Sequence, residues 1–307
     1  MLEIKNVYKT FNPGTINEKK ALNGLNLTLN DGDFVTVIGG NGAGKSTMLN
    51  MIAGVYLVDS GAIIIDGTDV TKLPEHKRAK YLGRVFQDPM MGTAADMWIE
   101  ENMALAARRG QRRGLKWAIN KHEREQFKKM LSELDLGLEN RLSAKVGLLS
   151  GGQRQALTLL MAVMKKPKLL LLDEHTAALD PKTAAKVLEL SDKFIAEEGL
   201  TAMMVTHNMR DAIAHGNRLI MMNNGKIILD VSGETPGLGQ NAAKESFYSQ
   251  YAGLKKGVSL LKNGAKAENN EVDAVTGATI TSTAVTRAVN AALDDFEKVK
   301  GATVGEE

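Results

Sequence analysis

Residues 39–46 read Gly-Gly-Asn-Gly-Ala-Gly-Lys-Ser, a glycine-rich loop that ends in a lysine and a hydroxyl side chain. The apolar, β-branched run Val35–Ile38 precedes the loop and predicts a buried strand, and the run Thr47–Ile52 predicts a helix. Strand, loop and helix in this order are the context in which such a loop binds phosphate. The sequence therefore predicts an α/β fold that holds the phosphate chain of a nucleotide.

The loop offers several kinds of phosphate ligand. Its glycines let backbone N–H groups curl around phosphate oxygens, and the N-terminus of the following helix adds its dipole. We expect Lys45 to reach the β- and γ-phosphates and the Ser46 hydroxyl to bind Mg²⁺. ATP and Mg²⁺ are therefore the expected cofactors, and the expected binding residues are Gly39, Asn41, Gly42, Gly44, Lys45, Ser46 and Thr47.

A second acidic motif follows a short apolar run. Leu169–Leu172 is wholly apolar, as is typical of a central strand in a parallel sheet, and it ends in Asp173 and Glu174. Carboxylates at the carboxyl end of such a strand face the crevice where ligands bind in open α/β sheets. We expect Asp173 to hold Mg²⁺, through water, and Glu174 to act as the general base on the attacking water. The alternative is that both residues merely cap the next helix.

Residues 149–153 read Leu-Ser-Gly-Gly-Gln and supply a second anion site. Ser150 can cap a helix that begins near Gln153, and Gly151 and Gly152 leave its N-terminal amides bare. Because the chain already has a phosphate cradle at Lys45, this second site makes sense if it serves the ATP of a partner molecule. The alternative is a helix cap without a ligand.

These motifs, in this order and at these spacings, resemble the nucleotide-binding subunit of an ATP-binding-cassette (ABC) transporter over about residues 2–231. The resemblance implies a P-loop NTPase fold: a RecA-like core with an antiparallel β subdomain and a helical subdomain. It also implies a homodimer in which each ATP is held by Lys45 of one subunit and Ser150 of the other. Transmembrane permease subunits would be direct partners and a solute-binding protein an indirect one.

The resemblance assigns roles to three further polar residues. Gln87 matches the glutamine loop that senses Mg²⁺ and the membrane partner. His207 follows an apolar strand and would place its imidazole near the γ-phosphate. Asp180 matches the carboxylate of a loop that touches the opposite subunit. The expected catalytic residues are therefore Lys45, Gln87, Glu174 and His207, and the expected metal ligands are Ser46, Gln87 and Asp173.

The adenine-binding residue is expected near the start of the chain. Phe11 is the predicted stacking aromatic, and Tyr8 is the alternative; either side chain could simply pack in a strand. His175 and Ala177 differ from the residues most common in the family after the catalytic glutamate. Neither departure removes a catalytic group.

Composition excludes some classes of protein. The chain has 307 residues, 43% of them hydrophobic, a net charge of +3 and no cysteine, which excludes disulfides and gives no argument for nucleic acid. No apolar run approaches the ~18 residues of a membrane-spanning helix, and the first residues are strand-like rather than a secretory signal. We expect a cytoplasmic protein, peripheral on the inner face of the cell membrane.

The segment Arg108–Lys129 is locally basic, with Trp117 and Phe127 among its lysines and arginines. The simplest interpretation is a solvated helical face. The alternative is a surface near the permease that meets anionic lipid headgroups. Binding of DNA or RNA is a third possibility.

The last part of the chain has a different character. Residues 232–239 are rich in turn formers, and the motif Asp273–Thr279 precedes a helical pattern with Val285, Ala288, Val289, Ala292, Leu293 and Phe296 on one face. Together with Glu234–Gly239, this motif resembles the flavin-carrying subunit of Rnf-type and sodium-pumping NADH:quinone oxidoreductases. The resemblance implies FMN esterified through its phosphate to Thr279.

The chain is therefore interpreted as a fusion, natural, engineered or misassembled. Residues 1–231 would be the ATP-binding domain, 232–300 the carboxyl-terminal part of an FMN-binding domain and 301–307 a disordered tail. We expect the ATP-hydrolysing subunit of a membrane transporter, an importer rather than an exporter, with an amino acid as the weakly favoured substrate. The alternatives are an electron-transfer role through FMN at Thr279 and a soluble ABC ATPase outside transport.

Overall fold

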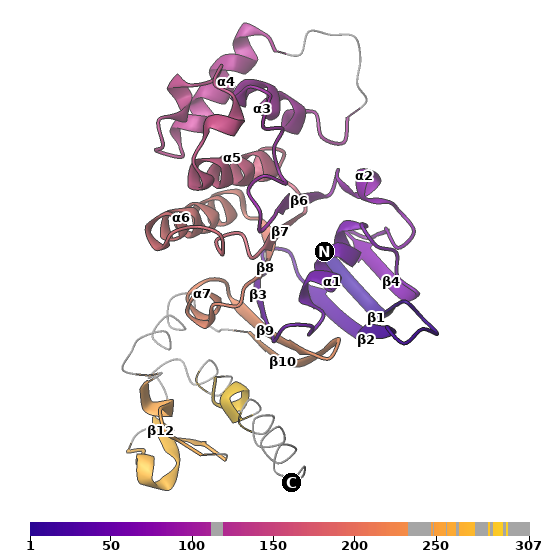
Figure 1. The fold of residues 1–307 in the computed structure, drawn as a ribbon, viewed down its shortest axis with the longest axis vertical. Coiled ribbons are helices and arrows are strands. Elements are labelled where there is room, and N and C mark those ends of the chain that lie inside the picture. The colour runs from indigo at the N-terminus through magenta and orange to yellow at the C-terminus, as the bar shows by residue number, and fades with distance from the viewer. Residues whose placement is uncertain are drawn as a thin grey trace.

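The computed structural model describes residues 1–111, 119–232, 247, 249–255, 257–261, 264–273, 282, 285–290 and 293. Two β-sheets and a set of helices form residues 1–232, and short elements follow near the carboxyl end (Figure 1). Thr279, residues 234–239, Trp117, Ala292 and Phe296 lie outside the described residues.

The larger sheet has six strands in the order β10-β9-β3-β8-β7-β6, parallel except for the antiparallel pair β9–β10. Its central strands are almost wholly buried, which explains why they read as continuous apolar runs. The strands are β3 (Phe34–Ile38), β6 (Leu82–Val85), β7 (Leu169–Asp173), β8 (Thr201–Val205), β9 (Arg218–Asn223) and β10 (Lys226–Ser232). The predicted strands before the glycine-rich loop and before Asp173 are confirmed.

The smaller sheet is antiparallel, in the order β2-β1-β4-β5. Its strands are β1 (Leu2–Phe11), β2 (Lys19–Leu29), β4 (Ser60–Ile65) and β5 (Thr68–Asp69). Along β1 and β2, buried residues alternate with exposed ones over most of the length, so the sheet covers a core with one face. The expected antiparallel β subdomain is confirmed.

Six of the labelled helices lie in two groups. α1 (Lys45–Ala53) and the short α2 (Glu75–Arg78) lie beside the smaller sheet, whereas α3 and α4 form one end of the molecule above α5 and α6 (Figure 1). The remaining helices are α3 (Ile99–Ala107), α4 (Lys121–Ser132), α5 (Gly151–Val163), α6 (Pro181–Glu198) and α7 (Met209–Ala214), with 3-10 turns at Leu138–Asn140 and Val146–Leu148. The expected helical subdomain between Gln87 and Ser150 is confirmed.

Two apolar cores lie on opposite faces of the larger sheet. Along β7, Leu170 and Leu172 pack into the core under α5 and α6, whereas Leu169 and Leu171 pack into the core shared with α1 and the smaller sheet. Successive side chains of a strand point to opposite faces. A strand buried on both faces must therefore be apolar at every position, and β7 is.

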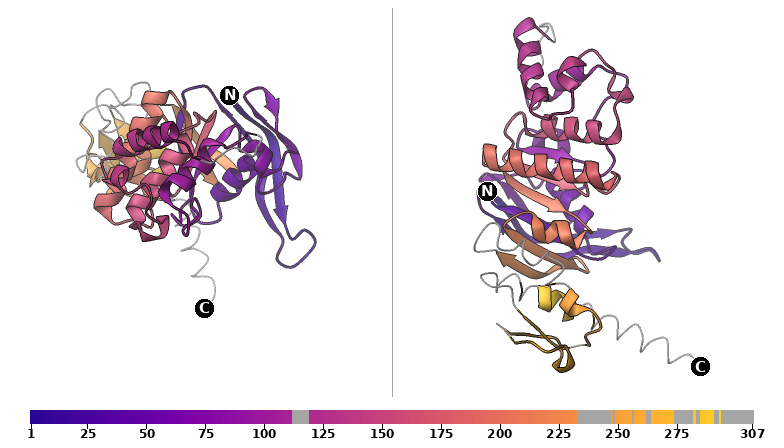
Figure 2. Two further views of the ribbon diagram at one scale, coloured as in Figure 1. Left: turned by 90° about the horizontal axis from the view of Figure 1, so that it is seen from above. Right: turned by 90° about the vertical axis from the view of Figure 1, so that its left-hand side faces the viewer.

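The described carboxyl-terminal elements lie at the end of the molecule opposite α3 and α4 (Figures 1 and 2). They are the parallel pair β11 (Ser259–Leu261) and β12 (Glu271–Asp273), 3-10 turns at Ser249–Tyr251 and Ala267–Asn269, and a helical segment at 285–290. In that segment Val285 and Ala288 are buried, as the predicted apolar face requires. Phe247 and Val285 form a small core against which Ile213 of α7 packs.

Candidate functional site

The glycine-rich loop lies between β3 and the start of α1, as predicted. Gly39 and Gly44 have φ angles of 149° and 103°, in the region that favours glycine. A Cβ at Gly39 would collide with the backbone oxygen of Met222, and one at Gly44 would lie 2.6 Å from the oxygen of Ala21. The loop is thus pressed between β9 and β2. Gly44 caps α1 without a side-chain bond, so the first N–H groups of α1 remain available to an anion.

Lys45 is held at the mouth of this loop. Its Nζ donates to the backbone oxygens of Gly39 at 2.7 Å and Gly40 at 3.3 Å, and the residue is only 7% exposed. These hydrogen bonds of the buried ammonium go to carbonyl oxygens, and Asp173 acts on it only through its charge, so a phosphate chain would supply directly bound negative charge. The cradle therefore fits the phosphates of ATP.

Asp173, the last residue of β7, is paired with Arg84 of β6. The Nη2 of Arg84 lies 3.2 Å from Oδ2 of Asp173 and 2.8 Å from Oδ1 of Asn50 in α1. Burial raises the pKa of Asp173 above its usual range, although the hydrogen bond and charge of Arg84 oppose this. Hydroxyl, amide and carboxylate oxygens are ligands that Mg²⁺ accepts. The donor set predicted from Ser46, Gln87 and Asp173 therefore fits Mg²⁺.

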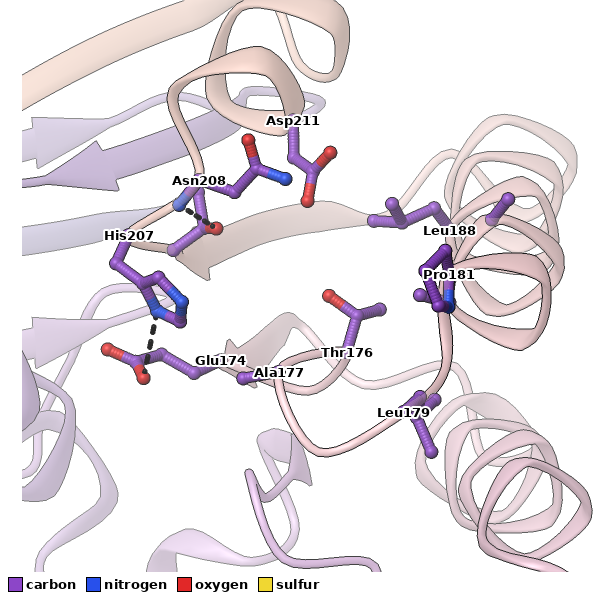
Figure 3. A pocket seen from close by; sticks show the side chains of 12 residues that line it. Glu174, Thr176, Ala177, Leu179, Pro181, Leu188, His207, Asn208 and Asp211 are labelled. Atoms are coloured by element: carbon purple, nitrogen blue, oxygen red, sulfur yellow. Dashed lines mark hydrogen bonds and ion pairs between the residues drawn. The ribbon is translucent and has the colours of Figure 1, made fainter.

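Glu174 has a left-handed backbone, with φ 45°, and its N–H donates to the oxygen of Val205 in β8 at 2.9 Å. Its Oε2 lies 3.3 Å from Nδ1 of His207, and the two side chains point toward one another at the edge of a cavity (Figure 3). The cavity has a volume of about 350 Å³, and Thr176 and Asp211 also line it. The structure thus brings the predicted base and the predicted histidine together.

The alternative that Asp173 and Glu174 only cap a helix is wrong. The N-cap of α6 is Asp180, whose Oδ1 accepts from the N–H of Thr183 at 3.1 Å. Hydrogen bonds from the side chain of Thr183 and then from its N–H hold the pKa of Asp180 below its usual range. Asp180 therefore caps α6 in its own subunit, in addition to its predicted contact with a second subunit.

His175 follows the predicted base and is buried, with 1% exposure. Its Nε2 lies 3.1 Å from Oγ of Ser191, which itself donates to the oxygen of Val187 at 2.8 Å. The single hydroxyl proton of Ser191 is thus in use, so Nε2 of His175 donates to Ser191. Burial lowers the pKa of His175 to about 4, and the ring is neutral.

The predicted second anion site lies at the N-terminus of a capped helix. Ser150 Oγ accepts from the N–H of Gln153 and Gln153 Oε1 accepts from the N–H of Ser150, both at 3.3 Å, in a capping box. The helix begins at Gly151, two residues before the predicted start. A Cβ at Gly152 would overlap Cγ2 of Thr183 in α6. Gly152 therefore permits close packing of two helices, a reason that the sequence analysis missed.

The aromatic site near the start of the chain contains Phe11, with a neighbour that the sequence analysis missed. The ring of Phe11 packs edge-on against Tyr56, with centroids 5.3 Å apart. Tyr8 instead packs against Gly24. A Cβ added to Gly24 would lie 2.9 Å from the hydroxyl oxygen of Tyr8. Lys19 pairs with Phe11 in the sheet and lies beside Gly42 of the loop, which makes it a further missed candidate. Only the strand register could have revealed it.

A larger cavity of about 650 Å³ separates the segment after β6 from α3 and α5. Met91 and Leu105 line it and are 66% and 42% exposed. Neighbouring basic side chains have internal partners: Arg108 pairs with Glu123 at 2.8 Å, and Arg109 donates to the oxygen of Ala162 at 2.8 Å. Arg108 and Arg109 of the basic segment are therefore engaged within the protein.

Comparison with known proteins agrees with this geometry. The ABC transporter family model matches residues 22–177, and the FMN-binding domain model matches residues 220–294. The chain belongs to the ABC transporter family. It is 46% identical to a tyrosine transport ATP-binding protein of Clostridioides difficile over 75% of this chain and 92% of the relative. It is 36% identical to a spermidine/putrescine import ATP-binding protein of Haemophilus influenzae, over 76% of this chain and 58% of the relative.

Solved structures show the same fold. The dimeric structure of a bacterial ABC transporter cassette superposes with a TM-score of 0.66 at 30% identity, covering 76% of this chain and all of that one. A related dimer in a post-hydrolysis state with ADP and phosphate gives a TM-score of 0.65 at 29% identity over the same shares. The chain is thus an ATP-binding, ATP-hydrolysing subunit of a membrane transporter, of a family whose ATPase domains dimerise on permeases. Within the described residues, none of the helices has the length and apolar character needed to cross a bilayer.

Proposed function

We propose that this chain drives import of an amino acid, tyrosine or a close analogue, through a permease served by a solute-binding protein. The observation that carries the proposal is the 46% identity to the tyrosine transport ATP-binding protein across 92% of that relative. Identity to the polyamine relative is lower, at 36%, and this chain spans only 58% of its length.

In the proposed mechanism, Lys45 exchanges its carbonyl partners for the β- and γ-phosphates of ATP. Ser46, Gln87 and Asp173 would hold Mg²⁺, which offsets phosphate charge when bound. Glu174 takes a proton from the attacking water.

His207 orients the carboxylate of Glu174 through the 3.3 Å contact and reaches the γ-phosphate once ATP is in place. The partner subunit would close the site with residues equivalent to Ser150, Gly151, Gly152, Gln153 and Asp180. Ser150 and Gly151 are exposed at the N-terminal end of α5, where an anion can approach. Phe11 would stack on adenine, with Tyr56 fixing its ring.

The proposed docking surface for the permease is the larger cavity between α3 and the segment after β6. Its exposed Met91 and Leu105 offer apolar contacts to a helix, and arginine cations surround it. Arg84 of β6 and Phe86, which follows that strand and precedes Gln87, also line the cavity. A permease seated there would lie next to a residue of the proposed metal site.

The test begins with the tagged chain, purified from membranes of its source together with its permease. The complex is reconstituted in vesicles with ATP on the ATPase side, and uptake of labelled tyrosine, spermidine and xylose is compared with that of Glu174→Gln complexes. We expect binding-protein-dependent tyrosine transport that the variant abolishes. Transport of spermidine or xylose alone, or transport in the opposite direction, would contradict the proposal.

A second candidate function rests on the FMN-binding domain match at residues 220–294. We propose that Thr279 is a competent acceptor for FMN through a phosphate ester, but that it stays unmodified in the cytoplasm. The proposed domains remain 1–231 for ATP binding and 232–300 for the flavin segment. In the structure β10 runs to Ser232, so the family match begins inside the β9–β10 hairpin.

Intact-mass spectrometry tests this proposal. Protein made alone in the cytoplasm should show no added FMN, whereas co-expression with a cytoplasmic flavin transferase, FAD and Mg²⁺ should add one FMN. Thr279→Ala should prevent the addition, and the matched control Thr281→Ala, just outside the Asp273–Thr279 motif, should permit it. Flavin bound without the transferase, or no flavin with an active transferase, would each contradict one half of the proposal.

A further inference from the structure

Arg84 connects the two elements that carry the proposed Mg²⁺ ligands. Its Nη2 donates to Oδ2 of Asp173 at 3.2 Å, at the end of β7, and to Oδ1 of Asn50 at 2.8 Å, in α1. Asn50 comes four residues after Ser46, so the two side chains lie on one face of α1. One guanidinium group therefore ties the helix of Ser46 to the strand of Asp173.

The Arg84 side chain is held firmly in this bridge. It is 12% exposed, and its Cζ lies 4.6 Å from the centroid of the Phe86 ring. Its Nε is buried and has no hydrogen-bond partner within the described part of the chain. Leaving a buried donor unsatisfied lowers stability. Fold stability alone therefore does not account for an arginine at this position.

The direction of approach separates Arg84 from the phosphates. Asn50 lies about one helical turn, ~5 Å, further into α1 than Ser46. Arg84 thus bonds both Asn50, one turn beyond Ser46, and one carboxylate oxygen of Asp173, Oδ2. The other carboxylate oxygen can then face the metal and its water shell.

We propose that Arg84 is a positioning residue for Mg²⁺, which sets the orientation of the Asp173 carboxylate relative to the Ser46 hydroxyl. This inference rests on the metal-binding roles proposed above for these two residues. Mg²⁺ requires nearly ideal octahedral geometry, so small movements of its ligands weaken binding sharply. Arg84 therefore raises the affinity for MgATP while leaving the affinity for metal-free ATP unchanged.

The test compares the dissociation constants of a fluorescent, non-hydrolysable ATP analogue in EDTA and in Mg²⁺. The dissociation constant in EDTA divided by that in Mg²⁺ reports how much the metal strengthens binding. This ratio does not require turnover. Arg84→Met should lower this ratio about tenfold, the effect of losing a hydrogen bond to a charged group, and should keep the EDTA value within about twofold. Arg84→Lys should lower the ratio less, because one ammonium can still reach Asp173.

Asn50, the second hydrogen-bond partner of Arg84, allows an independent test. Asn50→Ala should lower the ratio in the same direction as Arg84→Met, by a smaller factor. The double variant should be no worse than Arg84→Met alone, because residues that act through one contact are not additive. Additive losses would show that Asn50 and Arg84 act separately and would overturn the bridge.

Arg109→Met is the matched control. Arg109 lines the same cavity as Arg84 but donates to the oxygen of Ala162, so its loss removes an equal charge without touching the bridge. This variant should keep the wild-type ratio. Thermal unfolding without nucleotide checks that each variant folds, and if Arg84→Met does not, Arg84→Lys and Asn50→Ala decide the question.

Asp173→Asn distinguishes failure of the proposed metal site from failure of the proposed role of Arg84. If this variant keeps the wild-type ratio, the proposed metal site itself is wrong. If Asp173→Asn loses the Mg²⁺ enhancement but Arg84→Met keeps it, only the role of Arg84 is wrong. A ratio that rises in Arg84→Met would show that Arg84 competes with Mg²⁺ for Asp173, which also overturns the inference.

Discussion

The buried ring of His175 makes the stability of the protein depend on pH. Its pKa in the folded chain is about 4, because burial disfavours the charged ring, against about 6.5 in an unfolded chain. A lowered pKa means that the unfolded chain binds the proton more tightly. The contribution of His175 to stability is therefore complete above pH ~6.5 and is lost as the pH falls toward ~4.

The size of the effect follows from the same two values. Each pH unit between the unfolded and folded pKa removes about 1.4 kcal/mol, so lowering the pH from about 6.5 to about 5 removes about 2 kcal/mol. The hydrogen bond to Ser191 does not rescue the charged ring, since Nε2 already donates its proton there in the neutral form. The added proton would sit on Nδ1.

Urea unfolding of the wild type and of His175→Gln, at pH ~7.5 and pH ~5 and one ionic strength, measures this contribution. Glutamine keeps an N–H that can donate to Ser191 but does not titrate. The wild type should lose about 2 kcal/mol more than the variant between the two pH values. Equal losses in both proteins would refute the reasoning, because other groups would then carry the whole pH dependence.

Three further predictions concern the site. Glu174→Gln should keep ATP binding and lower the rate of ATP hydrolysis, measured as released phosphate, by ~10²–10⁴-fold. Near-normal turnover would refute the general-base role. Lys45→Ala should weaken nucleotide binding in titrations, whereas Ser150→Arg should spare monomer binding and block the ATP-dependent dimer seen by light scattering. Loss of monomer binding in Ser150→Arg would show that Ser150 does not act on the ATP of the partner. Gly152→Ala should lower the free energy of unfolding by ~1–3 kcal/mol, since its Cβ meets Cγ2 of Thr183, and added Thr183→Ser should restore most of it. A double variant as unstable as Gly152→Ala would place the strain elsewhere.

Local patterns predicted the elements that carry the site. The apolar run of β7 and the glycine-rich loop between β3 and α1 are contiguous in sequence, so strand, loop and helix could be assigned without knowing the rest of the fold. Ser150 was predicted as a helix cap because capping depends on only a few neighbouring residues. The start of α5 was misplaced by two residues because two glycines give no helical signal of their own.

Contacts between distant residues could not be predicted in this way. Arg84 and Asp173 are 89 positions apart and meet only because β6 and β7 are neighbours in the sheet. Arg84 had no predicted role, and Gly152 was predicted only as part of a bare helix end. Gly152 packs against Thr183 of α6, and local sequence patterns do not show which residues of two helices meet. Tyr56 escaped notice for the same reason, since its contact with Phe11 joins separate elements.

The left-handed backbone of Glu174 has a consequence for protein engineering. A residue with a Cβ loses roughly 1 kcal/mol in that conformation, which glycine avoids and asparagine tolerates better. Selection for heat resistance alone would therefore favour glycine or asparagine at position 174 and yield more stable proteins that lack the proposed general base. A library screened on melting temperature should hold this position fixed.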